Sequence, residues 1–127
     1  MKLPRTLHLE GSRLPKGTTD PDAIQFNNLK GQFLVIEEKV DGSGVSISLD
    51  NSLNLQVQHR GSQAIGKEYW QFNEWAETHW EDLLFLLGER YVLFGEWMHN
   101  KHAIFYDQLP NFFLESDIYD RDRKSVV

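Results

Sequence analysis

Three short segments of this chain place charged side chains and glycine directly after apolar residues. The first is Glu37-Glu38-Lys39-Val40-Asp41-Gly42-Ser43-Gly44, the second is His59-Arg60-Gly61, and the third is Gly95-Glu96-Trp97. A lysine amine can act as a nucleophile, and an arginine fork suits phosphate. A glutamate can accept hydrogen bonds from the hydroxyl groups of a sugar. Each segment alone also fits a charged surface turn, so its chemistry depends on whether the fold brings the three together.

The elements around these segments are mostly strands. Phe33-Leu34-Val35-Ile36 is a continuous apolar run, typical of a strand buried on both faces, and it would place Lys39 near the edge of a sheet. Residues 45–49 and 53–58 alternate apolar with polar side chains, and Asp50-Asn51-Ser52 between them has turn chemistry. This pattern predicts an antiparallel hairpin that returns Arg60 toward the end where Lys39 lies.

Residues 67–87 have helical spacing, which predicts one amphipathic helix that ends at Gly88. Its aromatic residues are expected to belong to the core. Further strand-like runs occupy residues 91–94, 104–106 and 112–114. One main helix among largely antiparallel strands predicts an α+β fold. Residues 1–31 contain prolines and glycines without a sustained period and predict an irregular N-terminal arm.

The composition excludes several classes of protein. The chain has 127 residues, a net charge of −6 and no cysteine, so disulfides and a general nucleic-acid coat are excluded. No apolar run approaches the ~18 residues that span a bilayer, and the N-terminus lacks a signal-peptide core, so we expect a cytoplasmic protein without membrane contact. His99 and His102 could be read as metal ligands, but without cysteine their spacing favours surface or core histidines.

Taken together, the charged segments resemble the motifs of the covalent nucleotidyltransferase superfamily, which comprises ATP-dependent DNA ligases, RNA ligases and RNA capping enzymes. Lys39-Val40-Asp41-Gly42 matches the defining pattern Lys-x-Asp/His-Gly, and Arg60 follows about twenty residues later. Phe94-Gly95-Glu96 and Phe113-Leu114-Glu115-Ser116-Asp117-Ile118 resemble the next two motifs. The N-terminal Leu7-His8-Leu9-Glu10-Gly11-Ser12-Arg13 looks most like the RNA ligase family that contains the phage type 2 enzymes. Gly44 and Ser116 depart from it, because relatives often carry asparagine and phenylalanine there.

The resemblance implies an ATP-dependent RNA ligase. Lys39 would attack the α-phosphate of ATP, release pyrophosphate and hold AMP through a phosphoramide bond. AMP would then pass to a 5′-phosphate, and a 3′-hydroxyl would seal the strand, so RNA ends are the expected partners. Glu38 would lie beside the adenine, Arg60 would contact the nucleotide or the RNA end, Glu96 would bind the ribose, and Phe113 would stack on the base. The full set of implied nucleotide-binding residues is Glu38, Asp41, Gly42, Arg60, Glu96 and Phe113.

A divalent cation is the expected cofactor beside ATP. A lysine attacks only as the neutral amine, whereas the carboxylates of Glu37, Glu38 and Asp41 favour its charged form. Mg²⁺ or Mn²⁺ that arrives with ATP would oppose these carboxylates and neutralise the polyphosphate. The sequence leaves the protein ligands of this metal open.

Two motifs of the resembled family have no counterpart in residues 119–127: a Glu-Gly strand and a Lys-x-Lys pair that grips the α-phosphate. We therefore expect residues 1–127 to be the N-terminal part of an adenylation domain, weakly active or inactive unless a C-terminal region or a partner supplies the missing groups. One alternative is a nucleotide-binding or interaction module without catalysis. Another is a DNA ligase or a capping-type nucleotidyltransferase.

Overall fold

The computed structural model describes residues 1–14, 16–99, 106–109 and 111–127, which form two compact units. The sheet unit comprises Met1–Leu3 and Val40–Val127, and the arm unit comprises Pro4–Lys39. The sheet unit has the α+β architecture that the sequence predicted. No helix of the described residues is long and apolar enough to cross a membrane.

One antiparallel sheet of six strands, in the order β3-β2-β1-β4-β5-β6, organises the sheet unit. Its strands are β1 (Ser43–Leu49), β2 (Leu55–His59), β3 (Ser62–Gln63), β4 (Tyr91–Trp97), β5 (Phe113–Asp120) and β6 (Ser125–Val126). The predicted hairpin is confirmed, because β1 pairs with β2 from Val45 opposite His59 to Leu49 opposite Leu55. β1 also pairs with β4, so it lies in the middle of the sheet.

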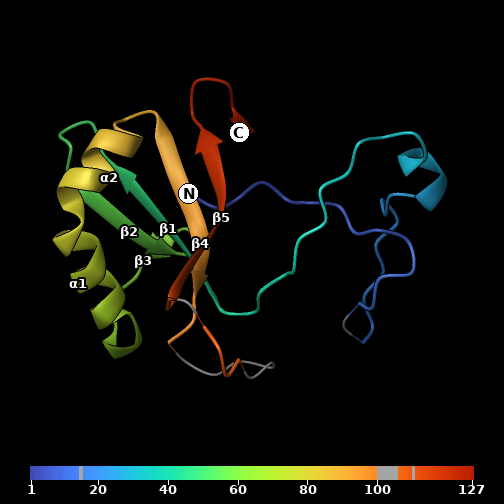
Figure 1. Ribbon diagram of the computed structural model, residues 1–127, viewed down its shortest axis with the longest axis horizontal. Coiled ribbons are helices and arrows are strands. Elements are labelled where there is room, and N and C mark those ends of the chain that lie inside the picture. Colours follow the sequence, from blue (N-terminus) through green and yellow to red (C-terminus); the bar gives the residue numbers. More distant parts are fainter. Residues whose placement is uncertain (15, 100–105, 110) are drawn as a thin grey trace. The chain divides into compact units, whose positions relative to one another are not determined.

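Helices α1 (Trp70–Thr78) and α2 (Trp80–Leu87) cover one face of this sheet (Figure 1). They follow the short 3-10 helix η2 (Lys67–Tyr69). As predicted, α2 ends at Gly88, whose φ of 49° lies in the left-handed region that glycine adopts readily.

The prediction of one continuous helix over residues 67–87 is wrong, because the helix is interrupted at His79, with φ −100° and ψ 18°. The Thr78 hydroxyl donates to the carbonyl of Glu74 at 2.8 Å, and His79 Nδ1 donates to the carbonyl of Trp75 at 2.7 Å. Side chains that bond to the carbonyl four residues earlier bend helices. Two such bonds at consecutive positions account for the break.

The hydrophobic core lies between the two helices and the sheet. Phe72 of α1 is fully buried, and its ring lies 5.1 Å from that of Trp97 and 5.3 Å from that of Phe113. The expected core role of the helical aromatics is confirmed for Phe72, whereas Trp80 is exposed. Other core residues from the sheet and the helices are Val45, Ile47, Leu49, Ala76, Leu83, Leu87 and Leu93.

The arm unit contains one β-bridge, between Leu9 and Ile24, and the 3-10 helix η1 (Phe26–Leu29). The strand predicted at residues 33–36 is wrong: these residues have no regular structure, and Phe33 and Ile36 are 94% and 90% exposed. A strand needs a neighbour for its amides and carbonyls, and each strand of the described residues pairs with another of the six. Lys39 therefore ends an irregular segment and does not follow a strand.

The strands predicted at 91–94 and 112–114 are confirmed as parts of β4 and β5. Residues 104 and 105 of the strand predicted at 104–106 lie outside the described residues, as does His102. Tyr106 has no regular structure, and its hydroxyl accepts a hydrogen bond of 3.0 Å from the backbone amide of Asp41.

Candidate functional site

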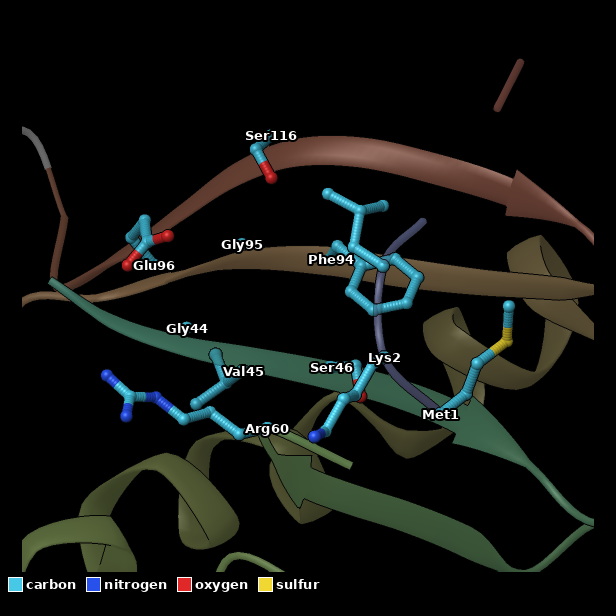
Figure 2. A pocket seen from close by; sticks show the side chains of 11 residues that line it. Met1, Lys2, Gly44, Val45, Ser46, Arg60, Phe94, Gly95, Glu96 and Ser116 are labelled. Carbon is cyan, nitrogen blue, oxygen red and sulfur yellow. The ribbon is translucent and has the colours of Figure 1, made fainter. Parts of the chain in front are cut away.

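A pocket of about 310 Å³ lies against the strands of the sheet unit (Figure 2). This volume falls at the lower end of the range for small-molecule sites, ~300–1,000 Å³. Strands β1, β4 and β5, the β2–β3 turn and the first residues of the chain contribute its lining, which consists of Met1, Lys2, Leu3, Gly44, Val45, Ser46, Arg60, Phe94, Gly95, Glu96 and Ser116.

Side-chain alternation assigns this pocket to the face of the sheet opposite the helices. Val45 and Ile47 of β1 point into the core, so Ser46 between them points the other way. On β4, Leu93 and Trp97 belong to the core, so Phe94 and Glu96 share the face of Ser46. The chemistry of the pocket is therefore separate from the aromatic core on the reverse face.

Arg60 reaches the pocket from a strained turn. Arg60 and Gly61 join β2 to β3 and both have positive φ, 49° and 84°, as in a type I′ hairpin turn. Left-handed backbone costs a residue with a side chain about 1–2 kcal/mol, whereas glycine adopts it readily. Strain of this kind gathers at functional sites, where it aims a side chain. The two-residue turn places the guanidinium at the pocket wall.

Two glycines, Gly42 just before β1 and Gly44 within it, leave room beside Glu96 and the end of β4. A Cβ added to Gly44 would lie 3.8 Å from Glu96 Oε1, so the carboxylate stands over a position without a side chain. A Cβ added to Gly42 would lie 2.5 Å from Met98 Sδ and 3.0 Å from the Trp97 carbonyl oxygen. Gly42 therefore allows the segment after Lys39 to run close beside the end of β4.

Phe113, which the resemblance implies as the residue that stacks on the base, does not line this pocket. Its side chain lies in the core, 8% exposed, and its ring centroid is 5.2 Å from that of Trp75. Phe94 pairs with Asp117 and Gly95 with Glu115, so Ser116 is the extra residue of a β-bulge. Bulges redirect side chains next to binding sites. Ser116 thus lines the pocket, while Phe113 packs on the opposite face.

The structure brings two of the predicted site residues, Arg60 and Glu96, to one pocket. Asp41 and Gly42 belong to the same unit and precede β1, whereas Glu38 and Lys39 are the last two residues of the arm unit. Sequence reasoning missed the pocket residues Lys2, Ser46 and Phe94. The alternation of residues 45–49 could have identified Ser46 as a side chain on the face opposite the core. Phe94 could have been found from its position directly before Gly95-Glu96. No local feature of the sequence indicates Lys2.

Charged groups at the pocket are mostly cationic. Lys2 and Arg60 oppose a single carboxylate, Glu96, although the whole chain has a net charge of −6. The strongest carboxylate shifts occur elsewhere: hydrogen bonds from Arg90 lower the pKa of Asp120 to about 2, and a hydrogen bond with His8 lowers the pKa of Asp20 to about 2. These two carboxylates belong to structural ion pairs.

Among the described residues, no group of three or more His, Cys, Asp or Glu side chains could hold a metal ion. His99 is exposed, and its ring lies 6.0 Å from that of Trp97 and edge-on to that of Phe112. Mg²⁺ that binds with a nucleotide keeps waters and phosphate ligands and needs only one or two carboxylates. Glu96 is a carboxylate of the pocket that fits this requirement.

Comparison with known protein families agrees with the resemblance seen in the motifs. A family model described as RNA ligase matches residues 32–126, which include β1 to β5 and the pocket strands. No curated protein and no solved structure gave a significant match. The match spans most of the chain, and the protein belongs to the RNA ligase family.

Proposed function

We propose that this member of the RNA ligase family is an ATP-dependent ligase of the phage type 2-like branch of the covalent nucleotidyltransferases, with Lys39 as the residue that carries AMP. The observation behind the proposal is the pocket of the sheet unit. It joins Arg60, Glu96 and Gly44, which come from three segments far apart in the sequence, in a volume suited to a small ligand.

The lining suggests how a nucleotide would bind. Figure 2 shows the Phe94 ring in the wall of the pocket, with Glu96 and Arg60 toward the other end of the view. An adenine ring would pack against the apolar side chains, and the ribose hydroxyls would donate to Glu96. Arg60 would hold phosphate oxygens through its fork of N–H groups. The hydroxyls of Ser46 and Ser116, which also line the pocket, would bond with polar atoms of the base.

Lys39 is the proposed nucleophile. It stands five residues before Gly44, so the extended chain between them spans at most about 17 Å. The neutral amine forms a bond to the α-phosphorus of ATP while the bond to pyrophosphate breaks, and the amine proton leaves to solvent. Glu38 and Asp41 flank this amine in the sequence and are proposed to contact the nucleotide. A bound divalent cation would supply charge neutralisation of the polyphosphate.

The remaining steps complete a ligation. A 5′-phosphate oxygen at an RNA end attacks the phosphorus of lysyl-AMP, and the bond to the lysine nitrogen breaks. The 3′-hydroxyl of the adjoining strand then attacks the activated 5′-phosphate and releases AMP. No net reducing or oxidising equivalent is needed, and ATP supplies the energy of the new phosphodiester bond.

The test is covalent labelling with ATP that carries radioactive phosphorus in the α position. We expect a labelled protein band in the presence of Mg²⁺ or Mn²⁺, removed by added pyrophosphate because that reverses the reaction. Lys39→Ala should lose the label, and Lys30→Ala, which removes another lysine of the arm unit, should keep it. A band that survives in Lys39→Ala, or that forms in excess chelator, would contradict the mechanism.

The same preparation separates the alternatives. Binding of ATP without covalent label would favour a nucleotide-binding module, and label from GTP in preference to ATP would favour a capping-type enzyme. Transfer of AMP to nicked RNA but not to nicked DNA of the same sequence is the result expected for an RNA ligase. Equal transfer to both would contradict the substrate assignment while leaving lysyl-AMP chemistry intact.

A further inference from the structure

We propose that Lys2 is a phosphate-binding residue of the nucleotide pocket and acts together with Arg60 on the polyphosphate of ATP. This inference rests on the proposed function. It assigns a role in the pocket to a residue that lies outside every segment in which the sequence resembles the ligase family, the first of which begins at Leu7.

The first observation is the place of Lys2 in the sheet unit. Met1–Leu3 group with residues Val40–Val127, and all three line the pocket. The Met1 ammonium donates a hydrogen bond to the side-chain oxygen of Gln58 on β2. The start of the chain is therefore held against β2, and Lys2 is presented at the pocket wall (Figure 2).

The second observation is the contact between Lys2 and the turn that carries Arg60. A Cβ added to Gly61 would lie 3.0 Å from Lys2 Cγ and 3.6 Å from its Cε, so the stem of Lys2 packs over Gly61. Long cationic side chains pack their methylenes in this way while the charged end stays in water. Gly61 thus serves two purposes, since it adopts φ 84° and makes room for the stem.

The third observation concerns charge. The ion pairs of the described residues have Arg5, His8, Arg90 and Arg123 as their cations, so neither Lys2 nor Arg60 is paired with a carboxylate in that part of the chain. Lys2 and Arg60 are both cationic lining residues of one pocket, so an anionic ligand bound there would be attracted to both. Phosphate is the anion that suits both an ammonium and a guanidinium.

The test compares ligands that differ in phosphate content. Dissociation constants of ATP, AMP and adenosine are measured by calorimetry for wild type, Lys2→Met, Lys2→Arg and Lys67→Met. The full chain should carry any tag at its C-terminus, because the Met1 amine contacts Gln58. Methionine keeps an unbranched stem over Gly61 without charge. Lys67 begins η2 and does not line the pocket, so it is the matched control.

We expect Lys2→Met to weaken ATP binding about tenfold, the size of one charge-assisted phosphate contact. Adenosine binding should change less than twofold, AMP should fall between, and Lys2→Arg should restore most of the affinity. Unchanged ATP affinity, or an equal loss for adenosine and ATP, would overturn the role of Lys2 and leave the ligase proposal standing. Absence of ATP binding by the wild type would overturn both.

Discussion

Gly95 and Gly44 lie on neighbouring strands, yet a methyl group should have opposite effects at the two positions. A Cβ at Gly95 would lie 2.5 Å from the carbonyl oxygen of Leu114 and 2.5 Å from Phe113 Cε2. Favourable contacts between such atoms require roughly 3.5 Å, so the neighbours must move by about 1 Å. The Leu114 oxygen belongs to the backbone of β5 and cannot rotate away.

The size of the effect follows from this overlap. Extra atoms in a packed interior cost about 1–3 kcal/mol, and a clash with backbone places Gly95→Ala toward the upper end. For a unit of this size, each kcal/mol shifts the melting temperature by about 4–8 °C. At Gly44 the nearest atom, Glu96 Oε1, is 3.8 Å away, an ordinary contact. Replacing this strand glycine by alanine should stabilise the fold by about 0.5–1 kcal/mol.

Urea unfolding followed by tryptophan fluorescence measures both changes. All tryptophans of the chain, at positions 70, 75, 80 and 97, belong to the sheet unit, so the signal reports that unit alone. Gly95→Ala should unfold at a lower urea concentration than wild type, and Gly44→Ala at a higher one. Equal midpoints for the two variants, or a Gly95→Ala protein as stable as wild type, would refute the packing argument.

Two further predictions concern carboxylates that hold the sheet unit together. Asp120 binds Arg90 through two hydrogen bonds, of 3.0 and 2.7 Å, and they hold its pKa at about 2 against an ordinary 3.8. This stabilisation is present above pH 3.8 and is lost as the pH falls through about 2, so wild type should lose stability over that interval. In thermal unfolding, Asp120→Asn should be less stable than wild type at pH 7, and its stability should fall less on acidification. Asp122→Asn, which removes only an exposed ion pair of 3.4 Å with the same Arg90, should lose much less stability at pH 7. Asp50 accepts the amides of Ser52 and Asn54 at 2.8 and 2.9 Å in the β1–β2 turn. Asp50→Ala should therefore lower the urea midpoint and Asp50→Asn, which keeps an acceptor, should lower it less; equal losses would contradict the assigned role.

Local signals explain the parts of this fold that the sequence predicts well. The alternation of apolar and polar side chains in residues 45–49 and the turn-forming residue Asp50 are signals that span only a few residues. The hairpin that they predict is present. Gly88 likewise ends α2 through its own backbone preference. By contrast, the break at His79 depends on two side-chain bonds to carbonyls, and helical spacing contains no sign of them.

The failed strand at residues 33–36 has a different cause. Apolar side chains in a row satisfy only one requirement of a buried strand, because its backbone also needs neighbours on both sides. Those neighbours are distant in sequence, and no periodicity within the run predicts whether they exist. The same limit applies to Lys2, which reaches the pocket only because the start of the chain lies against β2.

Phe113 shows that residue type alone does not determine which face of a sheet a side chain occupies. Residue type makes Phe113 the obvious aromatic for a base, but Phe113 pairs with Trp97 of β4 and shares the core face of the sheet with it. The Phe113 ring packs against Gly95, and its Cε2 is one of the atoms that the Cβ of an alanine at position 95 would overlap. Gly95 thus admits the Phe113 ring on the core side of the sheet, while its neighbours Phe94 and Glu96 line the pocket on the other side by strand alternation.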